Sequence, residues 1–280
     1  MFYLLIVLLQ MKILKTKNDL KKAILNTKNL GFVPTMGSLH EGHISLIKKS
    51  KKNSEKTLVS IYINPTQFNK KKDFKSYPRN INDDIIILKK MKVDFLFIPN
   101  SKQIYNNKFK VNFKLPRFER IMCANQRKGH FEGVLEVMDR LLNIVKPNNL
   151  FLGQKDYQQQ YLINKYLKKK HKFRLFVCKT IRNKYLALSS RNLNLSKELL
   201  SKANSITKEL FKIKKKYRLK RFRSSNSISF LKNLLNKKYQ IKIDYLEFRN
   251  PKNLKKTDYR NKFRLFIAYH INGIRLIDNI

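Results

Sequence analysis

The 280-residue sequence contains no tryptophan, only two cysteines, and seven residues each of glycine and proline. Cys123 and Cys178 cannot form a disulfide framework, and they do not have the spacing of metal ligands. A reduced, cytoplasmic setting is therefore the default expectation. The apolar residues 2–9 are too short to span a bilayer, and no basic residue precedes them. We treat residues 1–10 as an N-terminal extension or a mis-assigned start, with a signal peptide as the weaker alternative, and predict no membrane association.

Acidic residues are also scarce, because 18 Asp and Glu face 63 Lys and Arg, giving a net charge of +45. Taken alone, this charge favours a nucleic-acid partner, since clustered cations release counterions from a phosphate backbone. The basic residues are instead dispersed, and Lys, Asn, Ile, Phe and Tyr are abundant throughout, as in proteins of AT-rich genomes. We therefore favour compositional drift and predict no specific nucleic-acid partner. The hydrophobic content of 42% is sufficient for packed cores.

Apolar, β-branched runs alternate with segments of helical periodicity over most of the chain. The expected strands are residues 30–33, 57–63, 93–98, 150–152 and 173–178. The expected helices are residues 19–25, 43–52, 81–91, 131–145 and 156–169. This alternation predicts an α/β fold with a Rossmann-like, doubly wound parallel sheet over residues 11–182.

The pattern changes after residue 182. Helices are expected at residues 196–221 and 227–238, and strands at 240–248, 262–271 and 274–277. Asn272-Gly273 joins the last two strands and is a hairpin signal. Residues 183–280 are therefore predicted to form a smaller α+β C-terminal domain, which could act as a lid.

The segment PTMGSLHEGH, residues 34–43, lies between the first expected strand and a helix. A helix N-terminus offers free N–H groups and a positive dipole end, which suit phosphate. Gly37 and Gly42 allow close approach of a ligand, and His40 and His43 can donate to phosphoryl oxygens. Two capping histidines would be the ordinary interpretation of HxxH alone. The strand–turn–helix context favours a nucleotide site.

The segment GQKDYQQ, residues 153–159, also follows a strand and opens a helix. Gly153 permits close approach, Lys155 can meet a phosphate, and Asp156 can accept from ribose hydroxyls. Asp156 could instead be only a helix N-cap. Two glycine-bearing turns of this kind in one sheet favour the functional interpretation.

Three further segments have weaker signals. In NPTQF, residues 64–68, Gln67 could hold a hydroxyl or a carboxylate at the carboxyl end of a strand, or belong to an ordinary turn. RKGHFEGV, residues 127–134, could dock an anion or cap a helix. LSSRN, residues 188–192, could be a mobile loop that closes over phosphates or a surface turn.

YPR at residues 77–79 is followed by Asp83 and Asp84 at the start of a helix. Acidic residues there complement the helix dipole, and on the residues alone this interpretation is preferred. The alternative is a carboxylate near Mg²⁺ on nucleotide phosphates.

Together with the closing RLIDN, these ordered segments resemble the pantoate–β-alanine ligases of the HxGH-bearing nucleotidyltransferase superfamily, over residues 11 to 280. The resemblance implies an enzyme that adenylates pantoate with ATP and Mg²⁺ and releases pyrophosphate. The amine of β-alanine then attacks pantoyl adenylate, giving pantothenate and AMP. The resemblance further implies a homodimer.

The resemblance also assigns residues. His43 is implied as the proton donor, with His40 and Lys155 as further catalytic residues, and Asp83 as the carboxylate on the Mg²⁺ side. Pantoate and β-alanine are assigned to Gln67, Gln159, Arg127 and His130. ATP is assigned to Met36, Gly37, Ser38, Leu39, His40, Glu41, Gly42, His43, Gly153, Gln154, Lys155, Asp156, Ile181, Leu188, Ser189, Ser190 and Arg191.

The sequence departs from the family pattern at residues 182–185, which replace a turn that commonly contains Asp-Gly, and at Gln154, where relatives often carry Glu. Two other hypotheses remain. A nucleotidyltransferase acting on a phosphate monoester would share the HxGH turn but would not need Gln67 and Gln159 around a carboxylate. A basic nucleic-acid-binding protein would leave the HxGH, NPTQF and LSSRN segments without a role.

Overall fold

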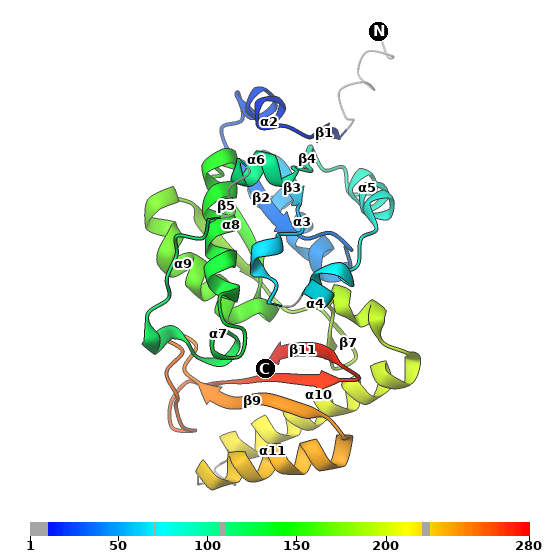
Figure 1. Cartoon of the computed structure of the whole chain (residues 1–280), viewed down its shortest axis with the longest axis vertical. Helices are drawn as coiled ribbons and strands as arrows, with labels where there is room; N and C mark the ends of the chain where they lie inside the picture. The colour runs from blue at the N-terminus through cyan, green and yellow to red at the C-terminus, as the bar shows by residue number, and fades with distance from the viewer. Residues whose placement is uncertain (1–10, 70, 107–109, 220–224) are drawn as a thin grey trace.

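The structure is a computed structural model that describes residues 11–69, 71–106, 110–219 and 225–280. Its main feature is a parallel sheet of six strands (Figure 1). Their spatial order is β1 (Lys12–Leu14), β4 (Phe95–Phe97), β3 (Lys56–Ile61), β2 (Leu30–Thr35), β5 (Asn149–Gly153) and β6 (Arg174–Cys178). The predicted parallel sheet is confirmed, and β1 is an additional edge strand of three residues.

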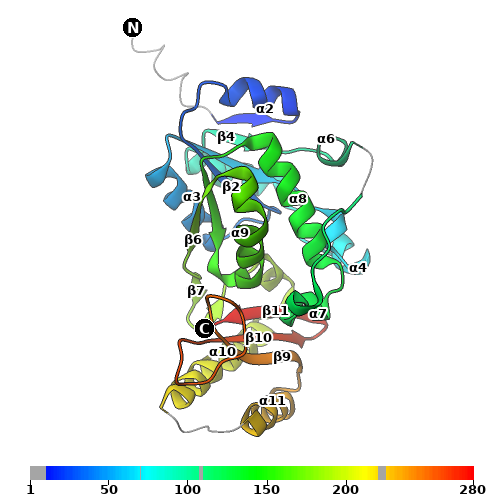
Figure 2. The same ribbon diagram turned by 90° about the vertical axis from the view of Figure 1, so that its left-hand side faces the viewer.

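Helices cover both faces of this sheet. On one face lie α8 (His130–Val145) and α9 (Tyr157–His171), which are prominent in Figure 2, and on the other lie α3 (Glu41–Asn53) and α5 (Ile81–Lys90). Neighbouring residues of a strand point to opposite faces, so Phe32 packs with the α8 side and Val33 with the α3 side. Both side chains are fully buried. Continuous apolar strands are therefore what this fold requires.

The order of the strands places a topological switch point between β2 and β5. The chain runs from β2 outward to β3 and β4, and later from β5 outward to β6. Ligands of open α/β sheets bind at the carboxyl ends of the strands beside such a point. The turns that follow β2 and β5, residues 36–43 and 153–156, are named here the first turn and the second turn.

Several short elements were not predicted. They are α4 (Lys71–Lys75), α6 (Ser101–Tyr105), α7 (Met122–Gln126), the single turns η2 (Pro65–Gln67), η3 (Arg117–Glu119), η4 (Gln154–Asp156) and η5 (Ser190–Asn194), and the hairpin of β7 (Arg182–Asn183) and β8 (Leu186–Ala187). Segments of at most five residues are too short to show periodicity. The helix predicted at residues 19–25 is observed as α2 (Lys17–Ile24).

The C-terminal part consists of α10 (Lys197–Arg218), α11 (Ser225–Tyr239) and an antiparallel sheet in the order β11 (Ile274–Asn279), β10 (Arg264–Ile271), β9 (Lys242–Arg249). Asn272 and Gly273 both have positive φ, as the predicted hairpin requires. The helix predicted to reach residue 221 ends at Arg218. The predicted N-terminal extension, residues 1–10, lies outside the described residues. Within the described chain, no helix has the length and apolarity needed to cross a bilayer.

Candidate active site

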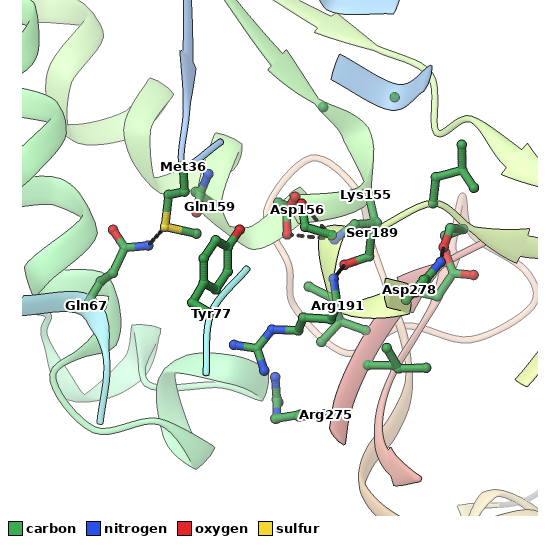
Figure 3. A pocket seen from close by; sticks show the side chains of 18 of the residues that line it. Met36, Gln67, Tyr77, Lys155, Asp156, Gln159, Ser189, Arg191, Arg275 and Asp278 are labelled. Atoms are coloured by element: carbon green, nitrogen blue, oxygen red, sulfur yellow. Dashed lines mark hydrogen bonds and ion pairs between the residues drawn. The ribbon is translucent and has the colours of Figure 1, made fainter. Parts of the chain in front are cut away.

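A cavity of about 970 Å³ lies where the carboxyl ends of the parallel strands meet the C-terminal sheet. Figure 3 shows side chains from both parts of the chain converging on it. Most of the site residues assigned from the sequence line this cavity. They are Met36, His40, Gly42, His43, Gln67, Arg127, His130, Gly153, Lys155, Asp156, Gln159, Ile181, Leu188, Ser189, Ser190 and Arg191. One cavity therefore gathers segments that lie far apart in the sequence.

The remaining assigned residues do not line the cavity. They are Gly37, Ser38, Leu39, Glu41, Gln154 and Asp83. Glu41 and Asp83 have exposed side chains, whereas Ser38 is buried. The first turn contains Gly37, Ser38 and Leu39, and the second turn contains Gln154.

The start of the first turn is held by a buried carboxylate from α5. Asp84, 1% exposed, accepts from the backbone N–H groups of Ser38 at 2.8 Å and Leu39 at 2.7 Å. Gly37 adopts φ +78°, and its N–H donates to the hydroxyl of Thr35 at 3.2 Å. These bonds shape the turn within the parallel-sheet domain itself. The residues alone placed Asp84 only at a helix dipole, so this role was missed.

The two histidines of the first turn bond to the backbone through the same ring nitrogen. Nδ1 of His40 accepts from the N–H of Gly42 at 3.0 Å, and Nδ1 of His43 accepts from the N–H of His40 at 3.3 Å. When each ring is neutral, its proton therefore lies on Nε2. A Cβ at Gly42 would lie 2.7 Å from the His40 ring, so glycine leaves room for this arrangement.

Both imidazoles are held in the neutral form. Burial, reinforced by the nearby ammonium of Lys155, lowers the pKa of His40 to about 4. Burial lowers the pKa of His43 to about 3, with smaller contributions from His40 and Lys155. At neutral pH the pair therefore acts through Nε2–H hydrogen-bond donors and not through positive charge.

The second turn brings a cation and a carboxylate to the opposite side of the switch point. Nζ of Lys155 lies 3.2 Å from Oδ1 of Asp156, and both side chains line the cavity. No side chain of its own caps this turn at Gly153 or at Asp156. Its carbonyls at Gln154 and Lys155 accept from Nδ2 of Asn279 in the C-terminal sheet.

The amide of Gln67 is oriented by a buried asparagine. Nδ2 of Asn64, 1% exposed, donates to Oε1 of Gln67 at 3.2 Å and to the carbonyl of Gly133 at 3.2 Å, while its Oδ1 accepts from the hydroxyl of Tyr105 at 2.8 Å. Nε2 of Gln67 therefore points away from Asn64, towards Sδ of Met36 at 3.0 Å. A Cβ at Gly133 would lie 2.4 Å from a backbone carbonyl of this turn, so α8 packs directly against it.

Arg127 and His130 lie beside Gln67. Nη1 of Arg127 donates to Nε2 of His130 at 2.8 Å, and Nδ1 of His130 donates to the carbonyl of Gln67 at 2.7 Å. Burial, followed by Arg127, lowers the pKa of His130 well below its usual value, which keeps the ring neutral. Burial lowers the pKa of Arg127 to about 10. In the part of the chain that the structure describes, no carboxylate forms an ion pair with Arg127.

The segment 188–192 closes one side of the cavity. Arg191 forms an ion pair with Asp73 of α4 at 2.9 Å, and the hydroxyl of Ser190 donates to the carbonyl of Ser38 in the first turn at 3.1 Å. The hydroxyl of Tyr77 bonds to Ser190, and burial raises the pKa of Tyr77. The segment is therefore joined to both the first turn and α4.

Arg275 is a cavity residue to which sequence reasoning assigned no role. It lies on β11, lines the cavity, and donates through Nε to Asp244 of β9 at 2.8 Å. Its Nη atoms lie 3.5 Å from Sγ of Cys123 on α7. The charges of Arg275 and Arg191 both disfavour protonation of Arg127, so three guanidinium groups share this end of the cavity. The signal was present in RLIDN, but only as part of the family pattern.

The cavity carboxylates are engaged by cations of the chain itself. The pairs are Asp73 with Arg191, Asp156 with Lys155, Asp244 with Arg275 and Asp278 with Arg182. Among the described residues, no group of three or more His, Cys, Asp or Glu side chains could hold a metal ion. Mg²⁺ that binds with nucleotide phosphates needs only one or two protein carboxylates, so the assignment of Asp83 to Mg²⁺ stays a prediction.

The chain is similar to known proteins over nearly its whole length. The family model described as pantoate-beta-alanine ligase matches residues 12–280. The pantothenate synthetase of Pseudothermotoga lettingae is 37% identical over 275 residues, covering 96% of this chain and 98% of the relative. That of Francisella tularensis subsp. novicida is 38% identical over 270 residues, covering 95% and 94%.

Solved structures agree with the sequence comparison. Pantothenate synthetase from Thermus thermophilus has a TM-score of 0.85 at 28% identity, covering 96% of this chain and 99% of that one. Pantoate-beta-alanine ligase from Francisella tularensis, complexed with beta-gamma ATP and beta-alanine, has a TM-score of 0.83 at 37% identity, covering 96% and 97%. By sequence and by structure, the chain belongs to the pantoate–β-alanine ligase family, whose members condense pantoate with β-alanine.

Proposed function

We propose that the protein uses ATP to activate pantoate as pantoyl adenylate, releasing pyrophosphate, and then transfers the pantoyl group to β-alanine, releasing AMP. In the first step a carboxylate oxygen of pantoate bonds to the α-phosphorus of ATP as the bond to pyrophosphate breaks. In the second step the amine of β-alanine bonds to the pantoyl carbonyl carbon, AMP leaves, and one proton is released.

The single observation that carries this proposal is the meeting of the two turns in one cavity. The Nε2–H groups of His40 and His43 come from one side of the switch point, and the ammonium of Lys155 from the other. The relative from Francisella is described as binding an ATP analogue and β-alanine. Donors in such positions stabilise the charge that develops on the α-phosphoryl and leaving oxygens.

The other end of the cavity suits a small branched hydroxy acid. Val134, Val137, Met138 and Leu141 recur at helical spacing on α8 and line the cavity, which suits the two methyl groups of pantoate. Gln67 and Gln159 supply amides for hydroxyl and carboxylate groups. A site that binds a phosphate monoester would gain little from such an apolar wall in the same cavity as two glutamines.

Arg127 is the best placed cation for a substrate carboxylate. It is half-buried and forms no ion pair with a carboxylate among the described residues, so an incoming carboxylate would find an unpaired guanidinium. His130 and the carbonyl of Gln67 hold its guanidinium in place. Both substrates of the ligase carry a carboxylate, as the proposal requires.

The chemistry needs positioning and charge stabilisation more than a nucleophile from the protein. Two anions, pantoate and ATP, must approach each other, and Lys155 with the neutral imidazoles lowers the repulsion between them. Both of these groups are held by hydrogen bonds within the turns, so little reorganisation is needed when substrates bind. We include the predicted homodimer in this proposal, to be checked by light scattering on the purified protein.

The test is a reaction with ATP, Mg²⁺, pantoate and β-alanine in which each component is omitted in turn. Pyrophosphate should form with ATP, Mg²⁺ and pantoate alone, and AMP and pantothenate should accumulate only when β-alanine is added. AMP formation that does not depend on pantoate would reject the proposal. A mass spectrum showing a dinucleotide-like adduct would point instead to a nucleotidyltransferase.

A further inference from the structure

Asn279, at the end of β11, connects the C-terminal sheet to the second turn. Its side chain is almost completely buried, with 2% exposure. Nδ2 donates to the carbonyl of Gln154 at 2.9 Å and to the carbonyl of Lys155 at 2.8 Å. The residues that it joins are 124 and 125 positions away in the sequence. Nothing in the motif of the second turn itself indicates this partner.

The orientation of the Asn279 amide is fixed by its other bonds. Oδ1 accepts from Nη1 of Arg264 on β10 at 2.9 Å, so the NH₂ group must face the second turn. The backbone N–H of Asn279 donates to Oδ1 of Asp278 at 2.7 Å, and its carbonyl accepts from Arg182 at 3.3 Å. Arg182 also pairs with Asp278. The two hydrogens of the Asn279 side-chain amide are therefore directed at the carbonyls of Gln154 and Lys155.

These two bonds matter because they fix the carbonyl groups on either side of Lys155, which a helix N-cap, an acceptor of N–H groups, does not bind. The single turn η4 begins after Gly153 without a side-chain hydrogen bond, and α9 begins after Asp156 in the same way. The two carbonyls that Asn279 binds flank the α-carbon of Lys155. A shift of these carbonyls would move the ammonium relative to His40 and His43 across the switch point.

We propose that Asn279 is a positioning residue that holds the backbone of the second turn so that Lys155 meets the nucleotide phosphates. The inference rests on the proposed function, because it requires that Lys155 acts on ATP. Asn279 does not line the main cavity and acts only through the turn. The C-terminal sheet thereby contributes to the adenylation step without contacting its reacting atoms.

The experiment is a double-mutant cycle on pantoate-dependent pyrophosphate release, using Asn279→Ala, Lys155→Met and the double variant. Removing a residue that orients a metal ligand typically costs about 10–100-fold in activity, and we expect a loss in that range in kcat for Asn279→Ala, because Asn279 orients Lys155 in a comparable way. The KM for β-alanine should change less than about twofold, since the amine enters at a later step. In the Lys155→Met background the same change should cost less than about threefold, because its target is already absent.

Asn279→Asp separates the donor from the shape of the side chain. Aspartate keeps the volume and the acceptor but places a carboxylate against two carbonyls, so it should lose at least as much activity as alanine. Asn253→Ala, at an exposed asparagine of the same domain, should leave kcat unchanged. Should Asn279→Ala fail to fold, judged by its melting temperature, Asn279→Asp takes its place in the cycle.

The outcomes distinguish the inference from the proposed function. Unchanged pyrophosphate release in Lys155→Met would remove the role of Lys155 and with it part of the proposed function. A large loss in Lys155→Met, together with an equally large further loss on adding Asn279→Ala, would overturn the inference alone. Full activity of Asn279→Asp would also overturn it.

Discussion

The two turns on either side of the switch point are stabilised from different places. The first turn is held mainly within the parallel-sheet part of the chain, through the carboxylate of Asp84 on α5 and the backbone bonds of its histidines, with one further bond from Ser190. The second turn receives its hydrogen bonds from Asn279 of the C-terminal sheet. Both turns share one sequence pattern, in which a strand is followed by a glycine-bearing turn and a helix. Nearby elements supply most hydrogen bonds to the first turn, whereas a distant part of the chain binds the second.

The parallel sheet alone therefore does not form the whole site. A chain cut after residue 182 would keep most bonds of the first turn and lose the one from Ser190 to the carbonyl of Ser38. The second turn would lose both bonds from Asn279. The cut chain would also lose Arg275 and the segment 188–192. Through these contacts the C-terminal part helps to build the end of the cavity beside the two turns, in addition to its predicted role as a lid.

The most damaging single change in the first turn should be His43→Ala. It removes a neutral Nε2–H donor from the proposed leaving-group side, and loss of one preorganised donor typically lowers kcat by about 10²–10³-fold. Pyrophosphate release measured at saturating substrates gives the loss directly. His171→Ala, a histidine outside the cavity, is the control and should retain its kcat. A His43→Ala protein that folds and turns over normally would contradict the catalytic assignment.

Asp84→Ala should destabilise the first turn without touching the second. Two buried N–H groups would lose their acceptor, at a cost of about 1–3 kcal/mol each, reduced if water enters. Urea unfolding of the variant measures this cost. Asp83→Ala removes the neighbouring exposed carboxylate and should change stability by less than about 0.5 kcal/mol.

The variant Asp83→Ala also tests the assignment of Asp83 to Mg²⁺. If Asp83 contacts Mg²⁺, the concentration of Mg²⁺ needed for half-maximal pyrophosphate release should rise in Asp83→Ala. Because Asp83 is exposed and does not line the cavity, we expect this Mg²⁺ concentration to stay the same in Asp83→Ala.

Gly133→Ala should disturb a third turn, the one that carries Gln67, and leave the other two intact. The new methyl group would meet a backbone carbonyl at 2.4 Å, and overpacking of this kind costs about 1–3 kcal/mol. We expect a lower melting temperature and a higher KM for pantoate, with the KM for ATP unchanged. Equal changes in both KM values would show that the third turn is not independent of the nucleotide end.

Acidification should act on the first turn through its two histidines, whose pKa values are lowered by burial. The folded-state values of about 4 and about 3 lie below the ordinary 6.5. At pH values between the folded-state and unfolded-state pKa values, the unfolded chain binds more protons than the folded chain. The contribution of these two histidines to the free energy of unfolding is therefore complete above pH 6.5 and is lost as the pH falls towards 3. Unfolding free energies at about pH 7.5 and about pH 5 should therefore differ less in His43→Gln than in the natural sequence. An identical difference would mean that His43 is protonated in the folded state.

Local patterns were sufficient to predict the sheet, its helices and the segments that meet in the cavity. The strand–turn–helix units could be predicted because periodicity and glycine placement are properties of neighbouring residues. Asp84, Asn64 and Asn279 could not be assigned, because their partners depend on packing between distant elements. Helices such as α6 and α7 were missed because five residues give too little periodicity.

The separation between Lys155 and Asn279 has a consequence for synthesis of the protein. A ribosome adds about 5–20 residues per second, so the 124 residues between them take on the order of 6–25 seconds to translate. During that interval the nascent parallel sheet can bury its apolar strands, but its lysine-bearing loop still lacks the amide that binds its carbonyls. ATP should therefore protect the emerging chain from proteolysis only after the final strand has left the exit tunnel.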